Sequence, residues 1–344
     1  MRRFFFWFFM VTLFSCSGGD EENIINNTNN VNNTNNINNS NNTNNVTTTT
    51  GECFKELLAQ APFSPRAGHT VTAVGDSLYL VGGFTNHDGT AVALNDVWKS
   101  GDGLSWIQLL ETAPFEPRTS HCAVSFQDRL WIMGGNRETD YYNDVWSSPD
   151  GITWNLERGP QDAGFSDRKG FTCLVFDSRI FILGGVDYGG LAQVWSSADG
   201  STWTLHTDAP WAGRAHHVSW VADGRMWVAG GHVYTTEYYN DVWSSADSES
   251  WVQEVEALPV ATLYGHSAFY TGERVVITGG NGNEDGVMVS PDGRLWQALP
   301  ERISRRSYHT STWFKGRGFL FGGSYTENMG IYLRNDVWAT CQTK

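Results

Sequence analysis

Arginine and histidine recur together along this chain, with each histidine three residues after the arginine position. Imidazole can bind a metal or transfer a proton near neutral pH, so this spacing is the first place to look for chemistry. The histidines are His69, His121, His217, His266 and His309, and Phe171 takes the position in the third copy. One histidine per copy is too dispersed for a metal site, and no zinc-type cysteine cluster or Glu-x-x-His pair accompanies them. We expect structural, hydrogen-bonded histidines and neither a metal nor a cofactor.

The same copies carry a matched arginine and aspartate. The arginines are Arg66, Arg118, Arg168, Arg214 and Arg306, with Leu263 in the fifth copy. The aspartates are Asp96, Asp144, Asp241 and Asp336, replaced by Gln193 in the third copy and Gly286 in the fifth. Because four copies keep both residues and one loses both, the pattern predicts a structural Arg–Asp bridge. Arg168 lacks its carboxylate, so we expect it to be freer to meet a ligand.

Tyrosines gather in stretches whose length varies from copy to copy. They are Tyr141, Tyr142, Tyr188, Tyr234, Tyr238, Tyr239, Tyr325 and Tyr332, with Trp211 in a neighbouring connection. Variable loops on a rigid scaffold often carry recognition, and tyrosine offers a stacking face together with a hydroxyl. These residues are therefore candidates for binding a protein or glycan partner. The alternative is that many of them only pack the loops.

A unit that recurs from about residue 53 to the C-terminus must position these side chains. Each copy contains an apolar run that ends in two glycines, and successive pairs lie 52, 50, 46, 49 and 43 residues apart. The pairs are Gly82-Gly83, Gly134-Gly135, Gly184-Gly185, Gly230-Gly231, Gly279-Gly280 and Gly322-Gly323. A period near fifty predicts a propeller or a solenoid. The second copy reads as four short antiparallel strands, which bury both sheet faces when copies are arranged in a ring.

The order of motifs in each copy resembles the kelch repeat of galactose-oxidase-type β-propellers. The motifs are Pro-Arg-x-x-His, an apolar run with Gly-Gly, Asn-Asp-Val-Trp and Asp-Gly-x-x-Trp. The resemblance implies an all-β fold, a six-bladed propeller over residues 51–344 with four antiparallel strands per blade. The expected blades are residues 66–110, 118–158, 168–208, 214–256, 263–299 and 306–344. The fold hosts unrelated activities, so it does not identify a function.

The last copy ends after its third strand and lacks an outer strand. Residues 53–58 match the outer strand of the first copy, because both precede Ala-Pro-Phe at the same spacing. We therefore expect this N-terminal segment to close the ring, which leaves no open sheet edge. The same alignment predicts a disulfide between Cys53 and Cys341. Cys122 and Cys173 are expected to be buried free thiols.

The N-terminus predicts export. Residues 1–15 read as a signal peptide, with Arg2 and Arg3 before a short apolar run, and the following Cys16 resembles the lipidated residue of a bacterial lipobox. Residues 16–50 then form an Asn- and Thr-rich tether that cannot bury apolar surface. We expect a bacterial cell-envelope lipoprotein, at the outer membrane or cell surface, that meets the membrane only through its lipid.

The net charge of the chain argues against some classes of binding partner. The net charge is −14, and removal of residues 1–15 deletes two arginines and no acids, which makes it −16. This charge argues against nucleic acid or an anionic membrane surface as a partner. The leading hypothesis is a non-catalytic module that binds a protein or glycan through its loop face.

Two alternatives remain open at this point. Exported six-bladed kelch propellers include sialic acid mutarotases, which the chain resembles in blade number and compartment. A mutarotase needs an acid–base pair at the channel mouth, for which Glu237, Glu138 and Arg168 are the available candidates. The other alternative is a structural surface protein whose propeller only spaces other components.

Overall fold

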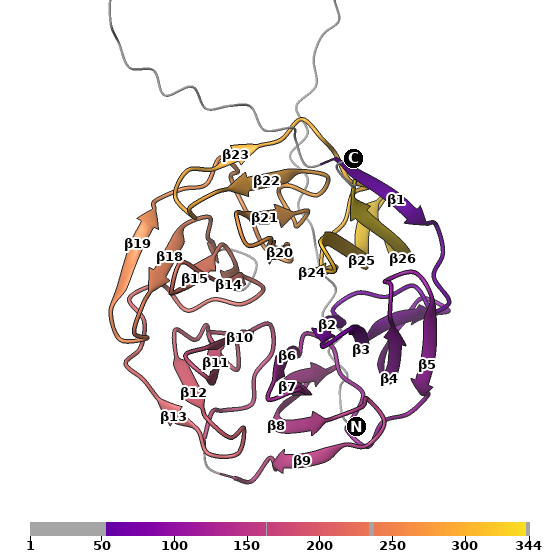
Figure 1. Cartoon of the computed structure of the whole chain (residues 1–344), viewed down its shortest axis with the longest axis horizontal. Helices are drawn as coiled ribbons and strands as arrows, with labels where there is room; N and C mark the ends of the chain where they lie inside the picture. Colours follow the sequence, from indigo (N-terminus) through magenta and orange to yellow (C-terminus); the bar gives the residue numbers. More distant parts are fainter. Residues whose placement is uncertain (1–52, 163, 234–236, 342–344) are drawn as a thin grey trace, which may run out of the picture. The chain divides into compact units, whose positions relative to one another are not determined.

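The computed structural model describes residues 53–162, 164–233 and 237–341. The expected signal peptide, Cys16, the tether and Tyr234 lie outside these ranges. Within them all regular structure is β-strand: six four-stranded antiparallel sheets are arranged around a common axis, and one further sheet has two strands (Figure 1). The predicted six-bladed propeller is therefore confirmed. No helix in the described ranges has the length and apolar character needed to cross a membrane.

Every blade runs from an inner strand at the axis to an outer strand at the rim. Blades 1 and 2 contain β2 (Thr70–Val74), β3 (Ser77–His87), β4 (Thr90–Ser100) and β5 (Trp106–Leu110), then β6 (Cys122–Phe126), β7 (Arg129–Arg137), β8 (Asp140–Ser148) and β9 (Asn155–Arg158). Blades 3 and 4 contain β10 (Thr172–Phe176), β11 (Arg179–Leu183), β12 (Val194–Ser197) and β13 (Thr204–Leu205), then β14 (Val218–Ala222), β15 (Arg225–Ala229), β18 (Val242–Ser245) and β19 (Trp251–Val255). Blades 5 and 6 contain β20 (Ser267–Tyr270), β21 (Val275–Thr278), β22 (Val287–Ser290) and β23 (Gln297–Ala298), then β24 (Thr310–Phe314), β25 (Arg317–Glu327) and β26 (Gly330–Thr340).

The N-terminal segment completes blade 6. Strand β1 (Phe54–Leu58) pairs with β26, with Phe54 opposite Thr340, and supplies the missing outer strand. Cys53 and Cys341 are joined by a disulfide, with their Cα atoms 5.3 Å apart. Both features agree with the expectation from the sequence.

A second disulfide corrects the sequence analysis. Cys122 of β6 and Cys173 of β10 are also bonded, with their Cα atoms 5.9 Å apart, so the expectation of two free thiols is wrong. The reason is the convergence of the inner strands on the axis, which places β6 beside β10. The two cysteines then fall within the separation that a disulfide spans.

The hydrophobic core is divided among the six interfaces between neighbouring blades. Between blades 6 and 1, for example, Phe319 and Phe321 pack against Phe63, Leu80 and Trp106. Equivalent clusters fill the other five interfaces. Fully burying one such side chain contributes about 1.5–3 kcal/mol, so stability depends on each blade having two neighbours.

The Gly-Gly pairs are explained by the same close approach of blades. A Cβ on Gly82 would lie 2.9 Å from the carbonyl oxygen of Arg118 in the next blade, and a Cβ on Gly83 would lie 2.7 Å from the Cβ of His69 in its own blade. Both glycines also have positive φ, at 58° and 91°. Any side chain here would collide with the backbone or with the histidine, so glycine is required at both positions.

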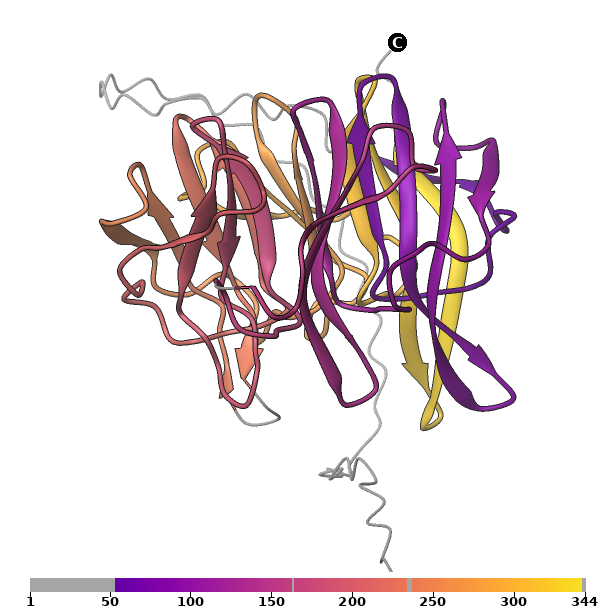
Figure 2. The same cartoon turned by 90° about the horizontal axis from the view of Figure 1, so that it is seen from below.

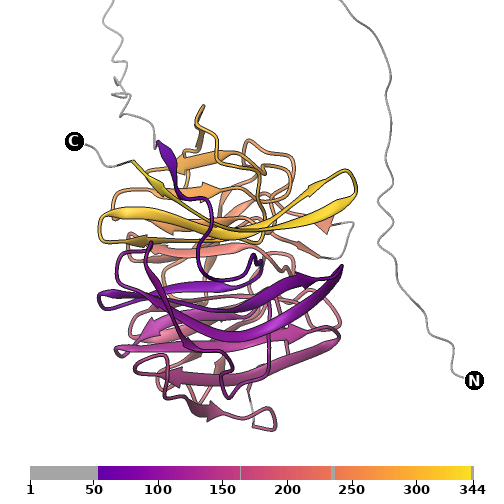
Figure 3. The ribbon, with the colours of Figure 1, turned by 90° about the vertical axis from the view of Figure 1, so that its right-hand side faces the viewer.

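The loops between second and third strands differ in length from blade to blade, and the long ones project from one face of the propeller. In blades 6, 1 and 2 these segments continue as the long hairpins β25–β26, β3–β4 and β7–β8, which project from the same face (Figures 2 and 3). Blade 4 adds a small sheet of β16 (His232–Val233) and β17 (Glu237–Tyr238). We call this side, which also carries the Pro-Arg segments, the loop face. Its long hairpins form a wall around half of the axis.

Candidate functional site

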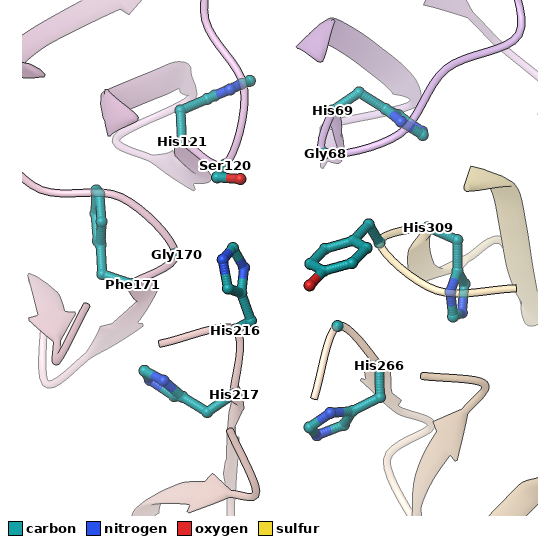
Figure 4. Close-up of a pocket in the computed structure, with 12 residues that line it drawn as sticks. Gly68, His69, Ser120, His121, Gly170, Phe171, His216, His217, His266 and His309 are labelled. Carbon is teal, nitrogen blue, oxygen red and sulfur yellow. The ribbon is translucent and has the colours of Figure 1, made fainter. Parts of the chain in front are cut away.

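A pocket of about 110 Å³ lies on the axis at the loop face, and every blade contributes two consecutive residues to it (Figure 4). The first residue of each pair forms an axial ring: Gly68, Ser120, Gly170, His216, Gly265 and Tyr308. The second forms a histidine layer: His69, His121, Phe171, His217, His266 and His309. Both sets come from the segment just before the inner strand, so the propeller ring itself assembles the pocket.

The axial ring is closed by six backbone hydrogen bonds. The N–H of each ring residue donates to the carbonyl of the ring residue in the preceding blade, and the N–H of Gly68 donates to Tyr308 across the closure. The donor–acceptor distances are 2.6–2.9 Å. Because each ring amide donates to a ring carbonyl, the backbone leaves no N–H donors here, and donors for a ligand at the ring must come from side chains.

Side chains alternate with glycines around this ring. All six residues have positive φ, between 53° and 64°, a conformation that costs a non-glycine residue about 1–2 kcal/mol. Blades 1, 3 and 5 use glycine, whereas blades 2, 4 and 6 carry Ser120, His216 and Tyr308. A Cβ on Gly170 would lie 2.9 Å from the His216 ring, and one on Gly265 would lie 3.1 Å from the Tyr308 ring. The glycines therefore make room for the side chains of the next blade.

The histidine layer ties neighbouring blades together. The Nε2 atoms of His121 and His217 lie 3.0 and 2.9 Å from the hydroxyl oxygens of Thr70 and Thr172 in the preceding blades. His309 makes the same contact with Thr278, at 2.9 Å. Burial is the main cause that lowers the pKa values of His121 and His266 to about 3, so both are neutral at physiological pH. The expected structural role is confirmed for the three histidines bonded to threonine.

The arginines form a second set of structural contacts, each within one blade. Arg118 donates to both carboxylate oxygens of Asp144, at 2.7 and 2.8 Å, and to the carbonyl of Gly134. Equivalent bridges join Arg66 to Asp96, Arg214 to Asp241 and Arg306 to Asp336. In blade 5, Leu263 is fully buried at the arginine position. The predicted structural bridges are therefore present in all four expected blades.

Arg168 corrects the sequence analysis, because it is fully buried and not free to meet a ligand. Its guanidinium donates to Gln193 Oε1 at 2.7 Å, to the carbonyl of Gly184 and to Ser166. Gln193 thus replaces the missing aspartate as a neutral acceptor. Burial without a carboxylate partner lowers the pKa of Arg168 to about 10.

Some of the candidate aromatic residues pack against other side chains, and the others face solvent. Tyr142 and Tyr239 cover the guanidinium groups of Arg118 and Arg214, with 4.8 and 4.4 Å between the guanidinium carbon and the ring centre. Trp211 is buried against Trp251, so its expected place in a binding surface is wrong. It lies in a connection between blades, where the core needs a large apolar side chain.

The remaining tyrosines lie toward solvent. Tyr325 and Tyr332 stack within the β25–β26 hairpin, 5.2 Å apart, and Lys169 lies over the ring of Tyr141. Tyr188 and Tyr238 are exposed. Their role in binding a partner stays a prediction.

An aromatic row beside the axis was missed by the sequence analysis. His216 stacks on His232, and Tyr308 meets the same imidazole of His216 edge-on at 5.1 Å. His232 also contacts Tyr264 at 4.3 Å, and Tyr264 stacks on Tyr238 at 5.3 Å. The available signal was the residue before each layer position, which runs Gly, Ser, Gly, His, Gly, Tyr through the six copies.

The proposed acid–base residues do not converge on this pocket. Glu138 is exposed at the tip of the β7–β8 hairpin, and Glu237 accepts a hydrogen bond from the hydroxyl of Tyr239 at 3.0 Å. Neither glutamate lines the pocket, and Arg168 is buried. Among the described residues there is also no group of three or more His, Cys, Asp or Glu side chains placed to hold a metal ion. The arrangement supports binding by neutral polar and aromatic groups.

Comparison with known proteins supports the assignment of the repeat. A model of the KLHDC2/KLHL20/DRC7 Kelch-repeats domain matches residues 18–185. The chain is 36% identical over 134 residues to the dynein alpha chain of the flagellar outer arm from Chlamydomonas reinhardtii, covering 38% of this chain and 3% of the dynein. It is 35% identical over 83 residues to the tRNA wybutosine-synthesizing protein 2/3/4 of Oryza sativa subsp. japonica, covering 23% of this chain and 8% of that protein. Together with the six observed blades and their motifs, these matches identify the chain as a kelch-repeat β-propeller.

Proposed function

We propose that this propeller is a non-catalytic binding module that holds a protein partner on its loop face. The observation that carries the proposal is the wall formed by the hairpins of blades 6, 1 and 2. At its highest point Met329, Ile331 and Tyr332 are 93%, 62% and 45% exposed, and Val92 is exposed on the neighbouring hairpin. Large apolar side chains grouped on projecting hairpins are typical of protein interaction sites.

The opposite face supplies a matched control for this proposal. Leu295 is 72% exposed in the turn between β22 and β23, at the other end of the blades. We expect the double variant Met329→Ser/Ile331→Ser to capture at least about tenfold less partner from solubilised cell envelopes, since buried apolar contacts of this size contribute more than 1.4 kcal/mol. Leu295→Ser removes one large exposed apolar side chain from the opposite face and should capture as much as wild type. Equal capture by all three proteins would contradict the proposal.

We also propose that the chain is exported and lipid-anchored through Cys16 in the cell envelope. The two disulfides support export, because disulfides persist in oxidising compartments. Mass spectrometry of the N-terminal peptide of the mature protein checks this point. We expect a peptide that begins at Cys16 and carries fatty acyl groups. An unmodified N-terminus would contradict the anchor and leave the binding proposal intact.

A further inference from the structure

The pocket on the axis has a combination of features that packing alone does not require. Ser120, His216 and Tyr308 occupy the three ring positions where a side chain has positive φ, and glycine is used at the other three. Within the described residues, the serine hydroxyl, the imidazole of His216 and the phenol of Tyr308 take part in no side-chain hydrogen bond. Strained backbone that presents half-buried polar groups to a pocket is typical of a ligand site.

We propose that this axial pocket binds an uncharged sugar residue, with one edge of the sugar entering the ring. Sugar hydroxyls would exchange hydrogen bonds with Ser120, His216 and Tyr308, which offer both donors and acceptors. The site is separate from the hairpin wall, so this inference does not depend on the protein partner proposed above.

The charge of the pocket favours a neutral ligand. None of the twelve residues that line it is an acid, a lysine or an arginine. Burial, His232 and Lys169 lower the pKa of His216 to about 3, so its imidazole is neutral at pH 7. Burial and the neighbouring Tyr264 and Tyr238 raise the pKa of Tyr308, so its phenol keeps its proton. A carboxylate would find no cation in the ring, which distinguishes this site from one built for an acidic sugar.

The aromatic row supplies the second half of sugar recognition. His232, Tyr238 and Tyr264 lie beside the ring on the blade 4 and blade 5 side, and Tyr238 is exposed. These rings stack on one another, so the face offered to the apolar C–H face of a pyranose is that of the exposed Tyr238 at the outer end of the row, as the ring side chains suit the sugar hydroxyls. This row lies on the low side of the loop face, opposite the hairpin wall.

The size of the pocket limits how the sugar enters. Its volume of about 110 Å³ is below the roughly 150 Å³ of a cavity that accommodates benzene. This volume holds a hydroxymethyl group or one ring edge, and not a whole hexose. The rest of the sugar would therefore lie outside the ring, against the aromatic row.

The chain offers variants that separate ligand binding from packing. Ser120→Gly and His216→Gly install the residue found in blades 1, 3 and 5, so they relieve backbone strain instead of creating it. Ser248→Gly makes the same kind of change at another positive φ, 69°, in the turn after β18 on the opposite face. Tyr308→Phe removes only the hydroxyl.

Saturation-transfer NMR on the full mature protein tests the inference, with methyl glucoside, methyl galactoside and N-acetylglucosamine as neutral probes and glucuronic and N-acetylneuraminic acids as charged ones. We expect transfer to at least one neutral sugar, and a loss of affinity of about tenfold or more in Ser120→Gly/His216→Gly and in Tyr308→Phe. Ser248→Gly and Met329→Ser/Ile331→Ser should bind the sugar as wild type does. Transfer only to the acidic sugars, no transfer to any neutral probe, or unchanged binding by the ring variants would overturn the proposal.

Discussion

Replacing Arg118 with methionine is expected to lower the free energy of unfolding by about 3–5 kcal/mol, because the change leaves a buried carboxylate without its partner. Asp144 is mostly buried, and the Nε1–H of Trp146 and a backbone N–H would be the donors left to it without Arg118. Burial alone would raise the pKa of Asp144, but the hydrogen bonds and charge of Arg118 outweigh that effect and lower it. Urea unfolding of the purified protein at neutral pH measures the loss.

Blade 3 provides the control for this prediction. Arg168→Met removes an equally buried arginine, but leaves the neutral amide of Gln193 behind in place of a carboxylate. Its cost should be smaller, at about 1–3 kcal/mol, the usual penalty for unsatisfied neutral acceptors. Adding Asp144→Asn to Arg118→Met should recover part of the larger loss. If the single and double variants unfold at the same urea concentration, the buried charge is not the cause.

Removing the closing disulfide with Cys53→Ser/Cys341→Ser is expected to cost about 5 kcal/mol, since the bond closes a loop of 288 residues and such loops restrict the unfolded chain most. The bond also holds β1 on β26, where Leu57 and Leu58 of β1 pack against the core between blades 6 and 1. Without it, transient loss of β1 would expose the edge of β26 and favour aggregation. Unfolding followed by light scattering measures both effects.

Cys122→Ser/Cys173→Ser is the comparison variant, because its bond spans only 51 residues. On loop length alone it should cost about 4 kcal/mol. It should not promote aggregation, since β6 and β10 are inner strands that pack against the inner strands of neighbouring blades and stay paired within their own sheets. An unchanged unfolding midpoint in the Cys53 and Cys341 variant would show that strand pairing alone closes the ring.

Much of the fold could be predicted because one unit is repeated. The Gly-Gly spacing, the missing outer strand of the last copy and the joint replacement of arginine and aspartate by Leu263 and Gly286 all report contacts that recur with each blade or occur at the closure. Such contacts recur at a fixed sequence separation, so comparison of the copies is enough to find them.

The errors concern contacts that comparison of the copies does not reveal. The Cys122–Cys173 bond depends on how closely two inner strands approach, and the burial of Trp211 depends on how a connection packs against the next blade. Arg168 was expected to be free because its blade lacks the aspartate, but Gln193 occupies the aspartate position and accepts its hydrogen bond as a neutral group. The axial ring was missed because its six residues come together only when the six blades close around one axis.

Amide hydrogen exchange with and without the captured partner tests most directly whether the partner lies on the loop face. We predict slower exchange in the β25–β26 and β3–β4 hairpins, around residues 324–334 and 84–93, and unchanged exchange in the turns that join third and fourth strands on the opposite face. Slowing confined to those turns, such as residues 101–105 and 291–296, with no change in the hairpins, would contradict the account.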